Sequence, residues 1–347
     1  MSGFVPGLEL SRAFYGEVVA PLTADVPHSA ALIGAGSEVQ AFDTERSADH
    51  DWGPRVLLFV PPGAVAEVEA RVTAALPESF GGYPTVFAQG GTPRHGVAVA
   101  EMGGWLNERL GFDPREQITT LDWLSTPWQA LAETTGGEVF HDGLGELEPV
   151  RQALRWYPDD VWRHVLACQW RRIGAEESFV GRSAEVGDEL GSAVLAAGLA
   201  RQVMRLALLQ RKRYPPYGKW LGSALARMSG AAELGQALAR ALQARSYHDR
   251  EQALCEAYER LAAVHNRIAL TTPLETAVRP FHTRPFRVIG GDRFAACLTE
   301  SIGDAAVRAL PPTGSIDQLC DNTDVLRTPA RARALAMAAL APSQAAA

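Results

Sequence analysis

Residues 31–60 read ALIGAGSEVQAFDTERSADHDWGPRVLLFV, which is two apolar segments joined by a polar connection. The first segment, residues 31–33, runs into Gly34 and Gly36, and the second, residues 55–60, lies between prolines. Short apolar runs bounded by Gly or Pro are typical of strands. We therefore expect a strand on each side of this connection.

The connection carries the residues with the clearest chemistry. Asp49 and Asp51 are two residues apart before the second apolar run, and on a strand such side chains point to one face. Two adjacent carboxylates repel each other unless a cation lies between them, so the pair predicts Mg²⁺. The backbone N–H groups of Gly36 and Ser37, with the Ser37 hydroxyl, suit phosphate oxygens. Together these residues predict a site for displacement at phosphorus, whereas His50 would face away and pack.

The surrounding N-terminal half alternates short apolar runs with helical patterns. Residues 85–88 and 96–100 read as further strands, and residues 8–22 and 63–76 have apolar positions at helical spacing. Such alternation indicates helices layered on a small sheet. We assign residues 1–148 to this first domain.

The C-terminal half, residues 149–347, reads as a helical bundle. Tyr214-Pro215-Pro216-Tyr217 must end a helix, because proline lacks the N–H and clashes with the preceding turn. The fold class is therefore α+β, with a mixed-sheet domain followed by a helical domain and an irregular C-terminal tail. The predicted helices are residues 159–178, 183–213, 217–228, 232–244 and 248–268, with a helix-capable stretch at 330–347.

Composition excludes several classes of protein. The 347 residues carry 33 Lys and Arg against 40 Asp and Glu, a net charge of −7, which disfavours a nucleic-acid coat. The four cysteines form no CxxC pair, so neither a zinc knuckle nor a dense disulfide framework is expected. The N-terminus lacks the pattern of a signal peptide, and no uncharged run reaches about 20 apolar residues. These features predict a soluble cytoplasmic protein with no membrane partner.

The same connection resembles a known signature. Gly36-Ser37, followed by Asp49-x-Asp51 and an apolar strand, is similar to the nucleotidyltransferase superfamily, and most of the chain resembles its DUF4037 branch. The further matching pieces are His141-Asp142-Gly143, residues 156–162, Gly187–Gly191, Tyr217–Leu221 and Arg279–His282.

The resemblance implies a nucleotidyltransferase-like domain joined to a helical bundle, as in aminoglycoside nucleotidyltransferases. It implies Mg²⁺ on Asp49 and Asp51 and a nucleoside triphosphate at Gly36 and Ser37. Such enzymes place a third carboxylate on a later strand, but that position here is Ala98. Glu101 lies just beyond and is the candidate third metal ligand if the strand is bulged.

Four further side chains are candidates for the same chemistry. Arg55 is either a structural residue or a phosphate contact, and Lys219 and Arg182 are candidate phosphate or acceptor contacts. Glu185 is the candidate catalytic base, because Glu185, Asp188 and Glu189 would share one face of a helix. A solvated acidic stripe explains the same spacing.

These features predict a Mg²⁺-dependent nucleotidyltransferase. It would move a nucleoside monophosphate from a nucleoside triphosphate to a hydroxyl or amine of a small-molecule acceptor, bound between the domains. Two alternatives stay open: a biosynthetic enzyme that uses the anion pocket for a different leaving group, and a non-catalytic nucleotide-binding or interaction protein. The sequence leaves the base, the acceptor, the pathway and the oligomeric state open.

Overall fold

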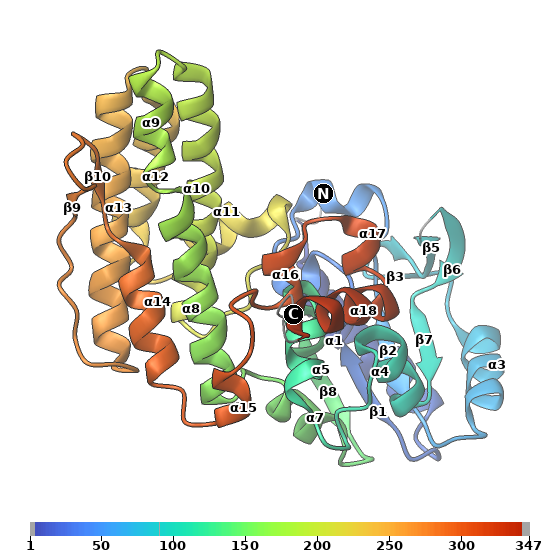
Figure 1. Ribbon diagram of the computed structural model, residues 1–347. Coiled ribbons are helices and arrows are strands. Elements are labelled where there is room, and N and C mark those ends of the chain that lie inside the picture. The colour runs from blue at the N-terminus through green and yellow to red at the C-terminus, as the bar shows by residue number, and fades with distance from the viewer. Residues whose placement is uncertain (1–3, 90, 342–347) are drawn as a thin grey trace. The chain divides into compact units, whose positions relative to one another are not determined.

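The chain divides into two compact units in the computed structural model, which describes residues 4–89 and 91–341 (Figure 1). The first unit consists of Met1–Asp122 and Gln129–Arg155, and the second of Trp123–Trp128 and Trp156–Ala347. Pro149, predicted to open the second domain, lies inside helix α7 (Leu147–Ala153) of the first unit. The α+β fold class is confirmed, with the small mixed sheet in the N-terminal half and helices in the C-terminal half.

A four-stranded mixed sheet organises the first unit, with strand order β7-β2-β1-β8. Strand β1 is antiparallel to both β2 and β8, and β2 is parallel to β7. The sequence predicted three of these strands to within a few residues but missed β8. The strands are β1 (Ser29–Leu32), β2 (Val56–Phe59), β7 (Val97–Ala100) and β8 (Glu138–Asp142).

The strand directions decide which residues meet. Because β1 and β2 are antiparallel, with Ala31 opposite Leu57, the residues after β1 lie beside those before β2. This end of the sheet carries the Gly36–Ser37 turn and Arg55. Because β7 runs parallel to β2, with Ala100 opposite Phe59, the residues after β7 lie at the other end.

The sheet buries its apolar side chains against helices on the same unit. Phe14 from the first helix and Val68 and Val72 from α3 pack into one core with Leu58 and Val97 of the sheet. The predicted helix over residues 8–22 forms as three consecutive segments, the middle one a π-helix. The helical segments are α1 (Gly7–Phe14), η1 (Tyr15–Val19), α2 (Ala20–Leu22), α3 (Val65–Ala75), α4 (Met102–Leu110), α5 (Thr120–Ser125) and α6 (Trp128–Thr135).

The strand predicted at residues 85–88 exists but belongs to a separate hairpin. Strand β5 (Val86–Gln89) pairs with β6 (Thr92–His95), and β3 (Ser79–Phe80) pairs with β4 (Tyr83–Pro84) in another. Periodicity predicts a strand but not its partner, because pairing depends on the neighbouring chain.

The second unit is helical, and its core confirms most predicted helices. Trp170 of α8 stacks on Phe294 of α14 with ring centroids 4.4 Å apart, and Trp162 donates to the carbonyl of Leu209. The chain leaves helix between α10 and α11, as Tyr214–Tyr217 predicted. The helices are α8 (Asp159–Glu176), α9 (Phe179–Glu185), α10 (Glu189–Gln210), α11 (Gly218–Ala226), α12 (Ala232–Gln243), α13 (Tyr247–Ile268) and α14 (Gly291–Glu300).

One prediction in this unit is wrong. Residues 183–213 do not form one helix, because α9 ends at Glu185 and α10 begins at Glu189. Gly187 has φ +80°, and Asp188 accepts a hydrogen bond from the N–H of Gly191 as the cap of α10. A left-handed glycine followed by a capping aspartate ends one helix and starts another.

The remaining elements are short. Strand β9 (Arg279–Pro280) pairs with β10 (Arg287–Val288). Residues 342–347 of the predicted C-terminal helix lie outside the described residues. The last helices are α15 (Ala305–Arg308), α16 (Ile316–Leu319), α17 (Thr323–Leu326) and α18 (Pro329–Leu340).

Helix α10 is, among the described residues, the one helix with the length and apolar composition of a membrane span. Of its apolar window, 56% is buried inside the structure. A core helix of a bundle has the same composition, and the burial of α10 fits that explanation.

Candidate functional site

The Gly36–Ser37 turn follows directly from buried strand β1. Gly34 has φ +92° and donates its N–H to the carbonyl of Glu133 at 2.8 Å, which fixes the start of the turn. Gly36 has φ +147°, and a Cβ there would lie 2.2 Å from the nearer terminal nitrogen of Arg55. Glycine is favoured at Gly36 because L side chains rarely adopt φ +147°, and a Cβ there would also displace the Arg55 guanidinium.

Arg55 reaches this turn from the residue before β2. Its Nη2 donates to the carbonyl oxygen of Ala35 at 2.8 Å and forms an ion pair with Oε1 of Glu38. The Arg55 side chain is 20% exposed, whereas the Glu38 side chain is 1% exposed. The structure thus places Arg55 beside the Gly36–Ser37 turn. It also places the buried carboxylate of Glu38 there, a residue that the sequence did not indicate.

Burial dominates the electrostatics of Glu38. Removal from water raises the pKa of its carboxyl, and the charge of Arg55 opposes that shift. Asp43, which accepts hydrogen bonds from the N–H of Gly7 and from Trp52 Nε1, raises the Glu38 pKa further. The turn therefore holds one guanidinium beside a carboxylate that is costly to keep charged.

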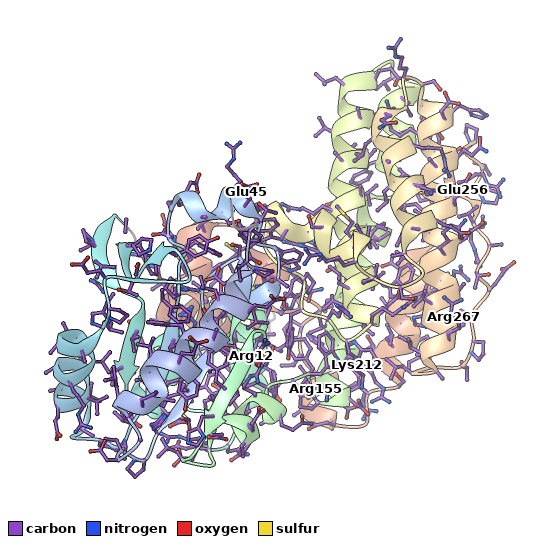
Figure 2. The ribbon with its side chains drawn as sticks, turned by 180° about the vertical axis from the view of Figure 1, so that it is seen from behind. Arg12, Glu45, Arg155, Lys212, Glu256 and Arg267 are labelled. Atoms are coloured by element: carbon purple, nitrogen blue, oxygen red, sulfur yellow. The ribbon has the colours of Figure 1, made fainter. Side chains whose placement is uncertain are left out.

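Asp49 and Asp51 do not lie on a strand, which corrects the predicted placement. Asp49 ends the short 3₁₀ helix η3 (Glu45–Asp49), which Glu45 opens (Figure 2), and Asp51 adopts a left-handed conformation with φ +50°. Both side chains are exposed, and His50 is exposed rather than packed, with its Nδ1 2.5 Å from Asp49 Oδ1. The alternation argument that placed both carboxylates on one face therefore does not apply.

Tertiary contacts delay the start of β2. Trp52 is 5% exposed and donates to Asp43, and Gly53 lies against the Phe87 ring, so neither continues a ladder. Ladder pairing begins when the N–H of Val56 donates to the carbonyl of Gly96 at 2.9 Å. These partners are distant in sequence, so the apolar pattern did not indicate that Asp49 and Asp51 lie outside β2.

Glu101 lies away from the turn. Ala98 is in β7 opposite Leu57, as the strand prediction requires, but Glu101 follows the end of β7 at the opposite end of the sheet. Its side chain caps α4 by accepting from the N–H groups of Gly103 at 2.8 Å and Gly104 at 2.5 Å. These bonds hold the pKa of Glu101 below its ordinary value.

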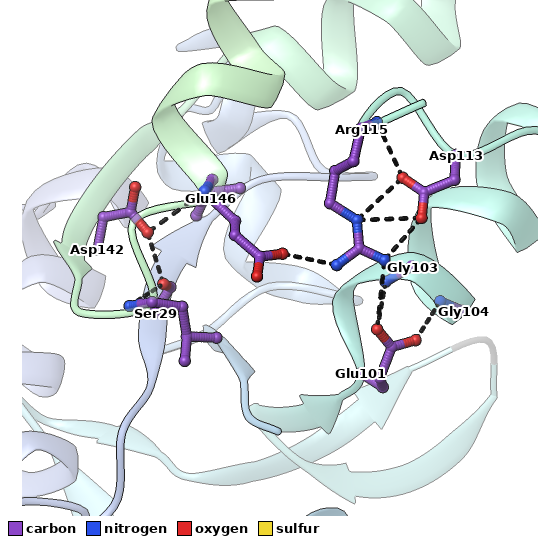
Figure 3. Close-up of polar contacts among 10 residues, drawn as sticks. Ser29, Glu101, Gly103, Gly104, Asp113, Arg115, Asp142 and Glu146 are labelled. Carbon is purple, nitrogen blue, oxygen red and sulfur yellow. Dashed lines mark hydrogen bonds and ion pairs between the residues drawn. The ribbon is translucent and has the colours of Figure 1, made fainter. Parts of the chain in front are cut away.

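Arg115 completes this second polar cluster (Figure 3). It forms ion pairs with Asp113 and Glu146, both at 2.6 Å, and lies 3.5 Å from Glu101. Each carboxylate has a cation or N–H partner, so the cluster connects loops of the first unit. The structure thus gives Glu101 a structural role and does not bring it to Asp49 and Asp51.

A resident metal does not fit the described residues. Among residues 4–89 and 91–341, no group of three or more His, Cys, Asp or Glu side chains is arranged to hold a metal ion. Octahedral Mg²⁺ needs several oxygen ligands, and two exposed carboxylates flanking a turn supply at most part of a shell.

The candidates in the second unit have their own partners. Glu185 pairs with Arg284 at 2.7 Å, and Glu189 pairs with Arg250 at 3.1 Å. With Asp188 capping α10, the three acids do not form one helical stripe, which corrects that prediction. Lys219, the second residue of α11, lies over the Trp220 ring at 4.7 Å, and Arg182 lies over Phe179 at 5.2 Å.

The His141-Asp142-Gly143 motif has a structural explanation in the first unit. Asp142 accepts from Ser29 Oγ at 2.6 Å and from the N–H of Glu148, so it joins β1 to the start of α7 (Figure 3). The N–H of Gly143 donates to the carbonyl of His28 at 3.0 Å. The motif therefore fastens the β8 edge of the sheet.

Comparison with protein families gives one match. Residues 123–221 match the model of DUF4037, a domain of unknown function. The matched range includes His141–Gly143 and Tyr217–Leu221 but does not reach the Gly36–Arg55 connection. No curated protein and no solved structure matches the chain. Over residues 123–221, the chain is thus similar to the DUF4037 domain.

Proposed function

We propose that the first unit binds the phosphate chain of a nucleoside triphosphate at the Gly36–Ser37 turn and transfers a nucleoside monophosphate to a small-molecule hydroxyl or amine. The supporting observation is the meeting of this glycine turn, after buried β1, with the Arg55 guanidinium at the start of β2. Backbone N–H groups and a guanidinium are complementary to phosphate oxygens.

Mg²⁺ enters this proposal as part of the Mg²⁺–triphosphate substrate. Asp49 and Asp51 are the proposed contacts for that ion, since both are exposed on the connection between the turn and Arg55. The described residues do not themselves form a resident metal site. What this chain supplies is binding: the turn and Arg55 hold phosphate oxygens.

The second unit is proposed to serve the acceptor. Glu185 is the proposed base, and it must leave Arg284 to take a proton. Lys219 and Arg182, which are both exposed on helices, are the proposed acceptor contacts. We propose the cytoplasm as the compartment, where the four free thiols would stay reduced.

A second candidate is nucleotide binding without transfer. The position of Glu101 at the opposite end of the sheet favours it, because no third carboxylate from β7 joins Asp49 and Asp51. Such a protein would bind a triphosphate and release no pyrophosphate.

Two measurements test the proposal: the melting temperature with and without Mg²⁺–ATP or the other triphosphates, and pyrophosphate release with a panel of acceptors. Arg55→Gln should abolish the ligand-induced shift. Arg71→Gln is the matched control, because Arg71 pairs with Asp25 and Glu67 in the same unit.

Asp51→Asn distinguishes the two candidates. Under transfer, the rate should fall about 10²–10³-fold, by analogy with loss of one electrostatic stabiliser. A wild-type protein that shifts its melting temperature but releases no pyrophosphate supports binding alone. A wild-type protein with neither response contradicts both.

A further inference from the structure

Glu38 occupies the phosphate turn of the structure itself. A Cβ on Gly36 would lie 2.7 Å and 2.8 Å from its two carboxylate oxygens, so the carboxylate touches the turn backbone. The same carboxylate forms the ion pair with Arg55. An anion from the chain therefore already lies where a phosphate oxygen would contact Arg55.

This ion pair is poorly satisfied by hydrogen bonds. Within the described residues, Oε1 of Glu38 is buried and has no hydrogen bond of acceptable geometry, although it lies within ion-pair distance of Arg55. Nε of Arg55 is also buried without an acceptor. A buried pair is favourable only when its remaining donors and acceptors are satisfied, so these two atoms weaken the pair, although the carboxylate also accepts from its own backbone N–H.

The neighbouring charges weaken the hold on Glu38 further. Asp43 is a second carboxylate close enough to disfavour the charge on Glu38, and it is itself held by Gly7 and Trp52. Arg55 keeps its bond to the carbonyl of Ala35 when Glu38 leaves. The guanidinium therefore stays beside the turn while its acidic partner is exchanged.

We propose that Glu38 is an internal counter-ion that a ligand must displace from Arg55, and that it thereby lowers the affinity of the turn for every anion. This rests on the proposed function, which places phosphate at the turn. Displacement carries the same cost for every anion, so it lowers all affinities by the same factor. A triphosphate places more charge at the guanidinium and the turn N–H groups than a single phosphate does, so the longer chain still binds after that cost.

The test measures binding of tripolyphosphate and of inorganic phosphate by calorimetry, in buffer with EDTA so that no metal contributes. Wild type should bind tripolyphosphate more tightly than inorganic phosphate. Glu38→Gln keeps the shape and removes the charge, so it should tighten binding of both anions about tenfold and leave the ratio of their affinities unchanged.

Two controls separate charge from position. Asp25→Asn removes the same charge from the Arg71 pair elsewhere in the unit and should change neither affinity. The double variant Glu38→Gln/Arg55→Gln should lose the gain. If Glu38→Gln does not fold, Glu38→Asp draws the carboxylate back by one methylene and should show a smaller shift in the same direction.

The outcomes distinguish this inference from the proposed function. A folded Glu38→Gln variant, or its Asp replacement, with wild-type affinity for both anions shows that the pair is only structural and overturns the inference alone. If neither wild type nor the Glu38 variants bind either anion, phosphate binding at the turn fails, and the proposed function and the inference fail together.

Discussion

Two buried glutamates, Glu38 in the first unit and Glu177 in the second, are compensated in different ways. Glu38 faces one guanidinium with an unsatisfied oxygen. Glu177, 7% exposed, follows α8 and accepts the backbone N–H groups of three consecutive residues, Ile289, Gly290 and Gly291, at 2.6–3.2 Å. Burial raises the pKa of both carboxyl groups, that of Glu177 to about 7.

The difference lies in what each carboxylate leaves behind. If Glu38 moves away, Arg55 keeps the Ala35 carbonyl and can take another anion from solvent. If Glu177 moves away, three consecutive N–H groups at the start of α14 lose their acceptor. A carboxylate paired with one partly exposed guanidinium can be exchanged for another anion, whereas one held by three backbone donors joins two segments together.

The largest expected effect is on stability in Glu177→Leu. Three donors lose their acceptor, at a cost of about 1–3 kcal/mol each. Because the variant no longer buries a carboxylate, we expect a net loss in the free energy of unfolding on the order of 4 kcal/mol. Urea unfolding at pH 7.5 measures it. Wild-type stability in this variant would show that the N–H groups find other partners and would remove the contrast with Glu38.

The second expected effect is a pH dependence from Glu177. Its folded-state pKa of about 7 exceeds the ordinary 4.5, so the folded protein keeps a proton that the unfolded chain releases between these values. The free energy of unfolding should therefore fall as pH rises from about 4.5 to 7, by roughly 3 kcal/mol at most. Glu177→Gln should flatten the curve in that window, and urea titrations of both proteins at several pH values measure the difference. Parallel curves would contradict a raised pKa at this residue.

A smaller change in stability is expected for Glu38→Gln. Losing the charge removes an ion pair with poor hydrogen bonds but also a buried carboxylate, so we expect a change within about 1 kcal/mol of zero. Thermal melting at pH 7.5 measures it beside Glu177→Gln, the matched buried variant. If Glu38→Gln is the more destabilised of the two, Glu38 contributes more to stability than Glu177, which would contradict the comparison made above.

The smallest effect is expected for Asp51→Asn. Asp51 is exposed outside helix and strand and has φ +50°, a region that Asn tolerates well. Its stability should stay within about 0.5 kcal/mol of wild type. A larger loss of stability in a melting experiment would show that the Asp51 carboxylate has a structural role.

Some misses had a signal in the sequence. Gly187 followed by Asp188 is a helix stop and a helix start, and it would have divided the predicted helix over residues 183–213. The buried role of Glu38 had no comparable signal. An acid directly after Gly36-Ser37 is as compatible with an exposed turn as with a buried ion pair.

The sequence by itself determined the α+β class, three strands of the sheet and most long helices, because apolar periodicity and proline influence backbone conformation only within a few residues along the chain. The tertiary structure decided which carboxylates meet which partners. Glu177 and Gly291 are 114 residues apart. The antiparallel pairing of β1 with β2 brings Arg55 to the Gly36 turn, and the parallel pairing of β7 with β2 places Glu101 at the other end of the sheet. Such pairings depend on strand direction and burial, which come from contacts between distant segments.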